Sequence, residues 1–444
     1  MTLFKRKIYE EMKQWKARYD GNYALLIKGA RRVGKSTIVE EFARTEYKSF
    51  ILIDFSNVSP DINALFNDMY DLDFFFMQLQ QLTKTKLYER ESVIIFDEVQ
   101  LQPLARQAIK HLVKDRRYDY IETGSLLSIK KNVQNILIPS EEHKVSMYPL
   151  DFEEFLTAIG DDMTWDMITQ AYRQKKPLGD AVHRRIMRIY RLYMLVGGMP
   201  QAVEVYLRQN YLGDVDMIKR EIIELYLDDF SKIDNTGFAA SVFEMIPAEL
   251  SRNTSRFSFS GTKKRSRVRN RDAILADMRD SYTINTAWRV DDPNVGMSMT
   301  IDPDSFKLFT LDTGIFVSLA FRDKAFTENV IYDKILTDKL SVNLGYVFEN
   351  AVSQELVSHG NRLYYHSMRS DTSNHIYEVD FILTQGKKIA PIEVKSSSYR
   401  THTSLDRFCE KYASRIGERY VIHTKDYKRE GGTTYLPVYM VGLL

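Results

Sequence analysis

The sequence has little of what marks a secreted or membrane protein. Its 444 residues contain a single cysteine, Cys409, which excludes an internal disulfide framework and a zinc cluster held by thiolates. No stretch approaches the run of roughly 18 apolar residues that spans a membrane. Residues 1–19 are rich in Lys, Arg and Glu and contain no apolar core segment. We therefore expect a cytoplasmic protein without a membrane partner.

The chain also lacks an excess of charge of either sign. Its 62 basic and 60 acidic residues leave a net charge of +2, so the overall charge indicates no class of partner and only local clusters are informative. Apolar residues make up 44% of the chain, which is enough for ordinary cores, and the length suggests roughly three domains. We expect a soluble multidomain protein.

A strand followed by a glycine-containing loop predicts a nucleotide site. The apolar run 23–28 leads into residues 29–36, which have the spacing Gly-x-x-x-x-Gly-Lys-Ser. The glycines let successive backbone N–H groups face an anion, and the following helix adds the positive end of its dipole. Lys35 would reach the β- and γ-phosphates, and Ser36 would ligate Mg²⁺. The residues expected around the nucleotide are Gly29, Ala30, Arg31, Arg32, Val33, Gly34, Lys35, Ser36 and Thr37.

Two further apolar runs predict a parallel sheet that ends in an acidic pair. Residues 49–55 form a near-continuous apolar run, which is typical of a strand buried on both faces. Residues 92–96 form another, followed by Asp97 and Glu98. Beside a phosphate loop, Asp97 would hold magnesium through water and Glu98 would polarise the attacking water as the base.

A third strand, 118–122, leads to a polar turn. Thr123 or Ser125 at its tip could contact the γ-phosphate, and a plain turn is an equal alternative. The guanine-reading signature Asn-Lys-x-Asp is absent from the sequence. We therefore expect the ligands to be ATP and Mg²⁺.

Several phrases of the sequence together resemble a known family. The order of elements resembles the AAA-type branch of the phosphate-loop ATPases, in which a separate strand carries the catalytic glutamate. More narrowly, the chain looks like a large family of uncharacterised prokaryotic ATPases whose AAA module is fused to a C-terminal domain with the restriction-endonuclease fold. The phrases that carry this resemblance are 25–37, 96–98, 123–125, 148–155 and 197–200.

The resemblance implies an α/β fold with several modules. It implies an AAA-type ATP-binding domain with a parallel sheet over residues 1–150, a helical lid over 151–235, a winged-helix-like domain over 236–325 and a restriction-endonuclease-like α/β domain over 326–444. AAA modules commonly work as rings and use an arginine from a neighbour or a lid, so the resemblance also allows a homo-oligomer. The arginines available for that role, among which nothing selects, are Arg106, Arg116, Arg117 and Arg191.

A basic segment in the middle of the chain is a candidate for contact with nucleic acid. Residues 263–271 hold six cations between an apolar helix, 242–250, and a further helix that contains Leu275 and Met278. A strand-like run, 284–290, follows. This order resembles a winged helix, whose basic helix start would meet DNA phosphates, with DNA favoured over RNA. A solvated loop whose charge serves solubility is an equal alternative.

Two apolar strands near the C-terminus predict a hairpin. Residues 376–383 and 389–395 flank Gly386-Lys387, which suits a tight turn with glycine first. If Gln385 faces Lys388, the register of the whole hairpin follows.

That register brings four charged residues to one face, with Asp380 opposite Glu393 and Glu378 opposite Lys395. Two carboxylates directly across a ladder repel, and a fold tolerates this mainly when a cation lies between them. The set resembles the Asp…Glu-x-Lys arrangement of restriction-endonuclease-like nucleases, in which the acids bind Mg²⁺ and the lysine helps to position or activate the attacking water. The resemblance adds Glu349 to the metal ligands Asp380 and Glu393. The alternative is a polar solvent face on which Glu378 and Lys395 form an ordinary salt bridge.

Two hypotheses of function follow. In the first, the protein is an ATP-driven enzyme on nucleic acid, in which Asp380, Glu393 and Lys395 cut the strand. In the second, it is a nucleotide-operated switch or scaffold whose C-terminal domain binds a partner without cutting. Both contain an ATPase, and they differ only in what the C-terminal acids do.

Overall fold

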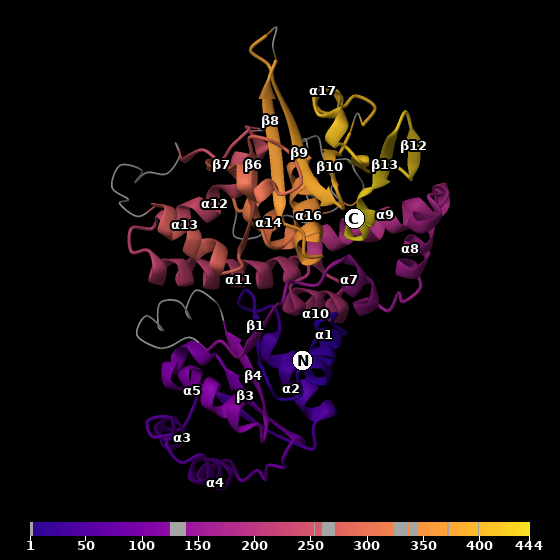
Figure 1. Ribbon diagram of the computed structural model, residues 1–444. Coiled ribbons are helices and arrows are strands. Elements are labelled where there is room, and N and C mark those ends of the chain that lie inside the picture. The colour runs from indigo at the N-terminus through magenta and orange to yellow at the C-terminus, as the bar shows by residue number, and fades with distance from the viewer. Residues whose placement is uncertain are drawn as a thin grey trace. The chain divides into compact units, whose positions relative to one another are not determined.

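The computed structural model describes residues 3–124, 139–252, 254–259, 271–323, 332, 336, 345–370, 373–397 and 399–444. The chain divides into two units (Figure 1). The first holds Met1–Tyr148 with Asp280–Tyr282, and the second holds Pro149–Arg279 with Thr283–Leu444. Each unit has its own sheet and is described by itself. Ser125 and the basic residues 263–270, both singled out in the sequence, lie outside the described residues.

The first unit is built on five parallel strands in the order β2-β3-β4-β1-β5. The strands are β1 (Ala24–Lys28), β2 (Ser49–Asp54), β3 (Ser92–Asp97), β4 (Asp119–Gly124) and β5 (Glu142–Ser146). Every pairing is parallel, and β3 and β4 are buried along their whole length. The predicted parallel sheet is therefore confirmed. The sequence of β5 contains a single apolar residue, Val145, which is why its pattern did not predict a strand.

Helices cover this sheet and close its core. The first helix, α1 (Ile8–Tyr19), buries Ile8, Met12 and Trp15 at spacings of three and four, and α2 follows the phosphate loop. Aromatic residues of α4 and of β3 pack in one cluster, which includes Phe75, Phe76 and Phe96. The other helices of the unit are α2 (Lys35–Glu46), α3 (Pro60–Leu65), α4 (Leu72–Thr83) and α5 (Pro103–Asp115).

The second unit holds a sheet of eight strands in the order β12-β13-β11-β10-β9-β8-β6-β7. The strands are β6 (Ile284–Val290), β7 (Ile301–Thr310), β8 (Leu363–Arg369), β9 (Ile376–Gln385), β10 (Lys388–Lys395), β11 (Arg419–His423), β12 (Lys428–Glu430) and β13 (Thr433–Pro437). The sheet is mixed, because β10, β11 and β13 run parallel while β9 is antiparallel to both of its neighbours. A mixed α/β architecture with a second sheet is thus confirmed.

Helices from a long stretch of sequence belong to this unit. They are α7 (Phe152–Ala158), α8 (Thr164–Gln174), α9 (Asp180–Val196), α10 (Pro200–Gln209), α11 (Leu212–Ile233), α12 (Phe238–Ser251), α13 (Arg271–Asp280), α14 (Thr313–Ala320), α16 (Gly345–Ser358) and α17 (Thr403–Lys411). The segment expected as a lid, 151–235, therefore falls in the same unit as the C-terminal sheet.

The segment expected as a winged helix does not form a sheet of its own. Its helices and the strand 284–290 are present, but β6 pairs in parallel with β8, so that Ala287 faces Leu363. Strand β7 then pairs with β6 at the edge. The expected boundary near residue 325 therefore runs through one sheet, because strands on both sides of it are hydrogen-bonded together.

The hairpin near the C-terminus has the predicted register. Gln385 faces Lys388, and the pairing continues to Phe381 opposite Ile392. Gly386 has φ 61°, in the left-handed region that glycine adopts without strain. Beyond the last pair, a side chain continues the contact between the two strands. Asp380 Oδ2 accepts a hydrogen bond of 2.7 Å from the backbone N–H of Val394.

Two of the phrases that marked the family resemblance meet inside this unit. The carboxylate of Asp312 accepts hydrogen bonds from the N–H of Gly198, at 2.6 Å, and of Ile315, at 2.8 Å. Gly197 has φ 81°, and a Cβ there would lie 2.3 Å from Asp312 Oδ1. Leu150 N–H completes the junction with a bond of 2.7 Å to the carbonyl of Gly198. The phrases around residues 150 and 197 thus build a buried junction.

Candidate functional sites

The phosphate loop takes its shape from two glycines and a distant arginine. Gly34 has φ 96°, and a Cβ on Gly29 would lie 2.3 Å from the carbonyl oxygen of Met147. Arg6 Nη1 donates to the carbonyl of Val33 at 3.1 Å and so braces the loop from outside. Arg6 could not be found from the sequence, because it lies in the segment before α1 and its partner is distant in the chain. Ala30 and Val33 are buried, while Arg31 and Arg32 are exposed.

Lys35 lies inside this loop. Its Nζ donates to the carbonyl oxygens of Gly29, at 3.0 Å, and Ala30, at 2.9 Å. Burial lowers the pKa of Lys35, and the charges on Glu98 and Asp97 oppose that shift. A buried ammonium that faces two acids at the mouth of an anion-binding loop can pair with phosphate oxygens.

Three polar side chains from separate elements meet beside Lys35. Ser36 Oγ, at the start of α2 and followed there by Thr37, donates to Asp97 Oδ1 at 2.9 Å. The hydroxyl of Thr123, at the end of β4, donates to the same oxygen. Because β4 lies between β3 and β1, the carboxyl ends of these strands share one edge of the sheet. The structure thus brings together Ser36, Asp97 and Thr123. These three residues were predicted site residues from separate segments of the sequence.

Glu98 follows Asp97 in an unusual backbone conformation. Its φ of 53° and ψ of 45° lie in the left-handed region. This conformation is rare for a residue with a side chain, and such backbone strain occurs mainly at functional sites. Its backbone N–H donates to Thr123 Oγ1 at 3.4 Å. The side-chain amide of Gln100 donates to the Glu98 carboxylate. Gln100 is a member of this site that the sequence did not reveal, because a glutamine after an acidic pair has no distinctive pattern.

Three of the four arginines named as finger candidates are engaged within the first unit. Arg106 is buried between Glu142, at 2.9 Å, and Glu122, at 3.7 Å. Arg116 donates to Asn22, and Arg117 pairs with Asp115 and Asp73. These contacts give Arg106 a structural task in the core of the unit.

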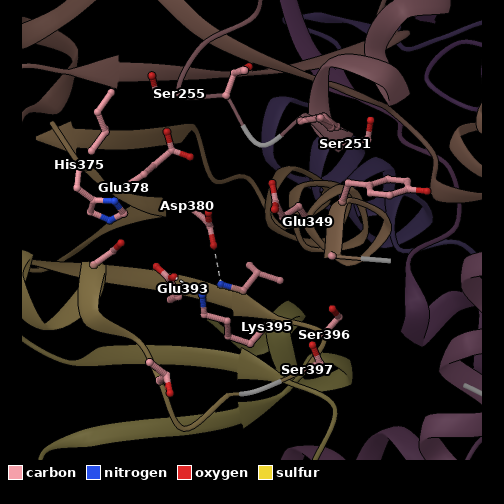
Figure 2. A pocket seen from close by; sticks show the side chains of 18 residues that line it. Ser251, Ser255, Glu349, His375, Glu378, Asp380, Glu393, Lys395, Ser396 and Ser397 are labelled. Atoms are coloured by element: carbon pink, nitrogen blue, oxygen red, sulfur yellow. Dashed lines mark hydrogen bonds and ion pairs between the residues drawn. The ribbon is translucent and has the colours of Figure 1, made fainter. Parts of the chain in front are cut away.

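The predicted acids of the C-terminal hairpin line a cavity of about 690 Å³. Glu349 reaches it from α16, Glu378 and Asp380 from β9, and Glu393 and Lys395 from β10 (Figure 2). The structure therefore brings all five predicted residues to one cavity. Its rim carries hydroxyl groups from the loops around it, including Ser251, Ser255, Ser396 and Ser397.

The ion pairs in this cavity differ from those expected. Lys395 Nζ lies 2.7 Å from Glu393 Oε1, on its own strand. Glu378 pairs instead with Lys307 of β7, whose side chain is only 5% exposed. The alternative of a polar, solvent-exposed face predicted a salt bridge between Glu378 and Lys395. Among the described residues these two side chains pair with other partners instead. Lys307 was missed because its partner lies on a strand far away in the sequence.

The acids in the cavity disfavour one another's charge. Burial, and next the charge on Asp380, raise the pKa of Glu349 to about 8, and the same two causes raise the pKa of Glu393 to about 8. Burial raises the pKa of Glu378, although Lys307 opposes this. Carboxyl groups with raised pKa values that share a cavity are typical of functional sites.

The fit of this cavity to a metal ion is incomplete as the side chains lie. Within the described part of the chain, no three Asp, Glu, His or Cys residues are grouped so that they hold a metal ion. The donor chemistry does suit a hard cation, because Glu349, Asp380 and Glu393 offer carboxylate oxygens. One of those oxygens, Glu393 Oε2, is buried without a hydrogen-bond partner, and a buried acceptor in that condition is costly unless something binds it.

Family models match three parts of the chain. Residues 21–156 match an AAA domain, residues 187–325 match a domain of unknown function (DUF8612), and residues 344–441 match another domain of unknown function (DUF4143). No curated protein matches the chain. No helix among the described residues combines the length and apolar character that crossing a bilayer requires.

Several solved structures are similar to the chain at low identity. A Walker-type ATPase of Pyrococcus abyssi is 16% identical with a TM-score of 0.41, and the match covers 71% of this chain and 96% of that one. The ORC1 protein of Aeropyrum pernix, solved in complex with DNA, is 11% identical with a TM-score of 0.26, covering 76% and 93% of the two chains. Cdc6p of Pyrobaculum aerophilum is 12% identical with a TM-score of 0.24, and the match covers 75% of this chain and 94% of that one.

Proposed function

We propose that this chain, whose residues 21–156 form an AAA-type ATPase domain, binds ATP with Mg²⁺ and hydrolyses it. The observation that carries the proposal is the contact of 2.9 Å between Ser36 Oγ and Asp97 Oδ1. These are the oxygens that hold magnesium in phosphate-loop ATPases, one directly and one through water. Their contact, next to the buried ammonium of Lys35, supports the proposal that a cation and phosphate oxygens bind side by side here.

Each residue of the site has a task in this reaction. The loop N–H groups and Lys35 would bind the β- and γ-phosphates, and Ser36 and Asp97 would hold Mg²⁺, which would supply neutralisation of the charge that develops on the phosphates. Glu98 orients and polarises the attacking water, and Gln100 fixes its carboxylate. Thr123 stands beside Asp97 at the end of β4, where a hydroxyl can hydrogen-bond the γ-phosphate.

Two variants test this assignment. Lys35→Ala should lose ATP binding, measured by titration calorimetry, because the loop then loses its buried cation, whose ammonium lies inside the loop. Glu98→Gln should bind ATP as tightly as the wild type and release phosphate at least 100-fold more slowly, since general base catalysis contributes about 10²–10⁴-fold. Glu91→Gln makes the same chemical change at an exposed position that pairs with Lys48, and it should leave the rate unchanged. A fully active Glu98→Gln enzyme would remove this residue as the base.

The acid cavity supports a second activity, metal-dependent cleavage of nucleic acid. The observation that favours it is the convergence of Glu349, Asp380, Glu393 and Lys395 on one cavity, with the buried oxygen Glu393 Oε2 left without a partner. Glu349, Asp380 and Glu393 would hold Mg²⁺, which supplies Lewis-acid activation of a phosphodiester. Lys395, held by Glu393, would position the attacking water.

Nicking of supercoiled plasmid separates this activity from the scaffold alternative. The wild type should nick DNA with Mg²⁺ or Mn²⁺, and Asp380→Ala combined with Lys395→Ala should abolish nicking. ATP hydrolysis should survive in that double variant, because both residues lie in the second unit. A wild-type protein that cuts neither DNA nor RNA, single- or double-stranded, would favour a nucleotide-operated scaffold.

A further inference from the structure

A second cavity, of about 510 Å³, adjoins the acid cavity in the C-terminal part of the chain. Its charged lining residues are Lys395, Arg400 and Lys425, and its hydroxyl groups include those of Thr401 and Thr424. No carboxylate is among its described lining residues. We call it the basic cavity. Its charge is opposite to that of the acid cavity.

The two cavities share one wall. Lys395, Ser396, Ser397 and Thr401 line both of them. The acids lie on one side of this wall, and Arg400 and Lys425 lie on the other. The two cavities are therefore adjacent.

Two of the three cations that line the basic cavity, Arg400 and Lys425, are available to an anion, whereas Lys395 is paired with Glu393. Arg400 and Lys425 are exposed, and among the described residues neither side chain forms an ion pair or a hydrogen bond. The nearby Glu430 is paired with Lys428, and this pairing is the main cause that lowers the pKa of Glu430, whereas Arg400 adds only a small effect. Other arginines of this region are paired with acids, namely Arg407 with Glu410, Arg415 with Asp292 and Arg429 with Glu418.

We propose that the basic cavity binds the phosphate backbone of a DNA strand at phosphates next to the one that enters the acid cavity. The proposal rests on the proposed nuclease activity and names the substrate as a polymer. A mononucleotide has its phosphate in a single place and fills one cavity, whereas a strand presents a series of phosphates to both. Lysine, arginine and hydroxyl side chains are the groups that bind phosphate oxygens in protein–DNA interfaces.

The binding should be independent of sequence. Contacts to phosphate fix the position of a strand and carry no base information. Tyr399, the one aromatic residue that lines this cavity, has a face covered by His423, with ring centroids 4.7 Å apart and planes at 20°. Its stacking capacity is therefore largely used within the protein, and phosphate contacts carry the affinity.

The test is binding of a fluorescein-labelled 20-nucleotide DNA, single-stranded or duplex, followed by fluorescence anisotropy in EDTA so that no cleavage occurs. The variant Arg400→Ala with Lys425→Ala should bind more weakly. Its slope of log K against log salt should fall in magnitude by about 1.4 for single strands and about 1.8 for duplex, from 0.7 and 0.9 per lost phosphate contact. The control, Arg407→Ala with Lys411→Ala, removes the same charge from α17, outside both cavities, and should keep the wild-type slope.

Each outcome decides the matter. An unchanged affinity and slope in the Arg400→Ala, Lys425→Ala variant, or a wild type that binds neither form of DNA, overturns the proposal. Displacement of the labelled strand by millimolar deoxyadenosine monophosphate would show a mononucleotide site and would also overturn it. If the variant loses binding as expected and the wild type cuts no nucleic acid with Mg²⁺ or Mn²⁺, the nuclease activity fails while the basic cavity stands. If plasmid nicking is unimpaired in the variant, the basic cavity fails while the nuclease stands.

Discussion

Removal of Arg106 should strongly destabilise the first unit. This side chain is 3% exposed, and it lies 2.9 Å from Glu142, which is 1% exposed, and 3.7 Å from Glu122, which is fully buried. In Arg106→Met the two carboxyl groups would remain in the core, with only the half-exposed Lys144 at 3.6 Å from Glu142. The variant keeps most of the volume of the side chain, so the loss is electrostatic.

The magnitude follows from two opposing effects. At an effective dielectric constant of about 20, a pair at 2.9 Å attracts by about 6 kcal/mol and one at 3.7 Å by about 4 kcal/mol. The variant can avoid most of this loss, because burial and the neighbouring Glu142 already raise the pKa of Glu122 well above its ordinary value. A protonated Glu122 carries no charge. We therefore expect a loss of about 3 kcal/mol at pH 7, at the low end of the range for one broken buried pair.

The pH dependence gives the sign of the effect. A carboxyl group whose pKa is higher in the folded than in the unfolded state binds more protons when folded, so its contribution to stability is present below the ordinary carboxyl pKa and is lost as pH rises through the raised value. Without Arg106 this loss grows, because the main charge that lowers the pKa of Glu122 is gone and only Lys144 still lowers it. The difference in stability between the wild type and Arg106→Met should therefore be larger at pH 8 than at pH 5.

Tryptophan fluorescence can report this unit alone. Trp15 is its only tryptophan, since the other two, Trp165 and Trp288, lie in the second unit. Urea unfolding in a Trp165→Phe, Trp288→Phe background, followed by Trp15 emission, should show the loss. Arg116→Met is the control, because that side chain contacts only the surface, and it should change the free energy of unfolding by no more than about 0.5 kcal/mol. Replacing the whole cluster with Arg106→Met, Glu122→Leu and Glu142→Leu should restore stability. A loss below 1 kcal/mol for Arg106→Met, or one that does not change between pH 5 and pH 8, would refute the reasoning.

Three further variants probe the second unit. Lys307→Met should cost about 3 kcal/mol, because Glu378 loses its partner in a buried pair, and adding Glu378→Gln should recover most of it; a silent single variant would contradict the pairing. Gly197→Ala should lower the stability measured by thermal unfolding by about 2 kcal/mol or more, because residue 197 has φ 81° and a new Cβ would lie 2.3 Å from Asp312 Oδ1. Gly360→Ala is the control, since Gly360 also has a positive φ but open space around it. This control should lose only the free energy of the backbone strain. Asp312→Ala should lower the free energy of unfolding by about 1–3 kcal/mol in the same assay, because the buried N–H groups of Gly198 and Ile315 lose their acceptor. A loss near zero would show that these hydrogen bonds do not stabilise the junction.

Local patterns were enough to predict that the glycine-containing loop and the acidic strand end lie together. The loop 29–36 and the strand that ends in Asp97 each carry their own signal of glycine spacing or continuous apolar residues. Parallel strands then place the ends of β1, β3 and β4 at one edge of the sheet. The hairpin register was predicted for a related reason, because Gly386 fixes the turn and every pair follows from it.

The pairings between distant strands could not be predicted in this way. Residues 284–290 were correctly predicted to form a strand. Their sequence does not show that β6 pairs with β8, because the backbone groups along a strand can hydrogen-bond to any other strand of suitable length. That one pairing turned an expected winged helix into part of a larger sheet, and it brought β7, with Lys307, toward the acids. Arg6 and Gln100 were missed for the same reason, since each acts through a contact that only the folded chain creates.

The placement of Lys307 also bears on what the acid cavity does. A cavity lined by four carboxyl groups would be unstable if only Lys395 balanced them, because buried like charges repel. Lys307 supplies the second cation from below the sheet edge, and it pairs with Glu378, which the Asp…Glu-x-Lys pattern does not use. The pattern residues Asp380 and Glu393 are thereby left to face Glu349, with Glu393 Oε2 unpartnered. The fold thus pairs the extra acid with Lys307 and leaves Glu393 Oε2 without a hydrogen-bond partner, which is the arrangement that the proposed cation site requires.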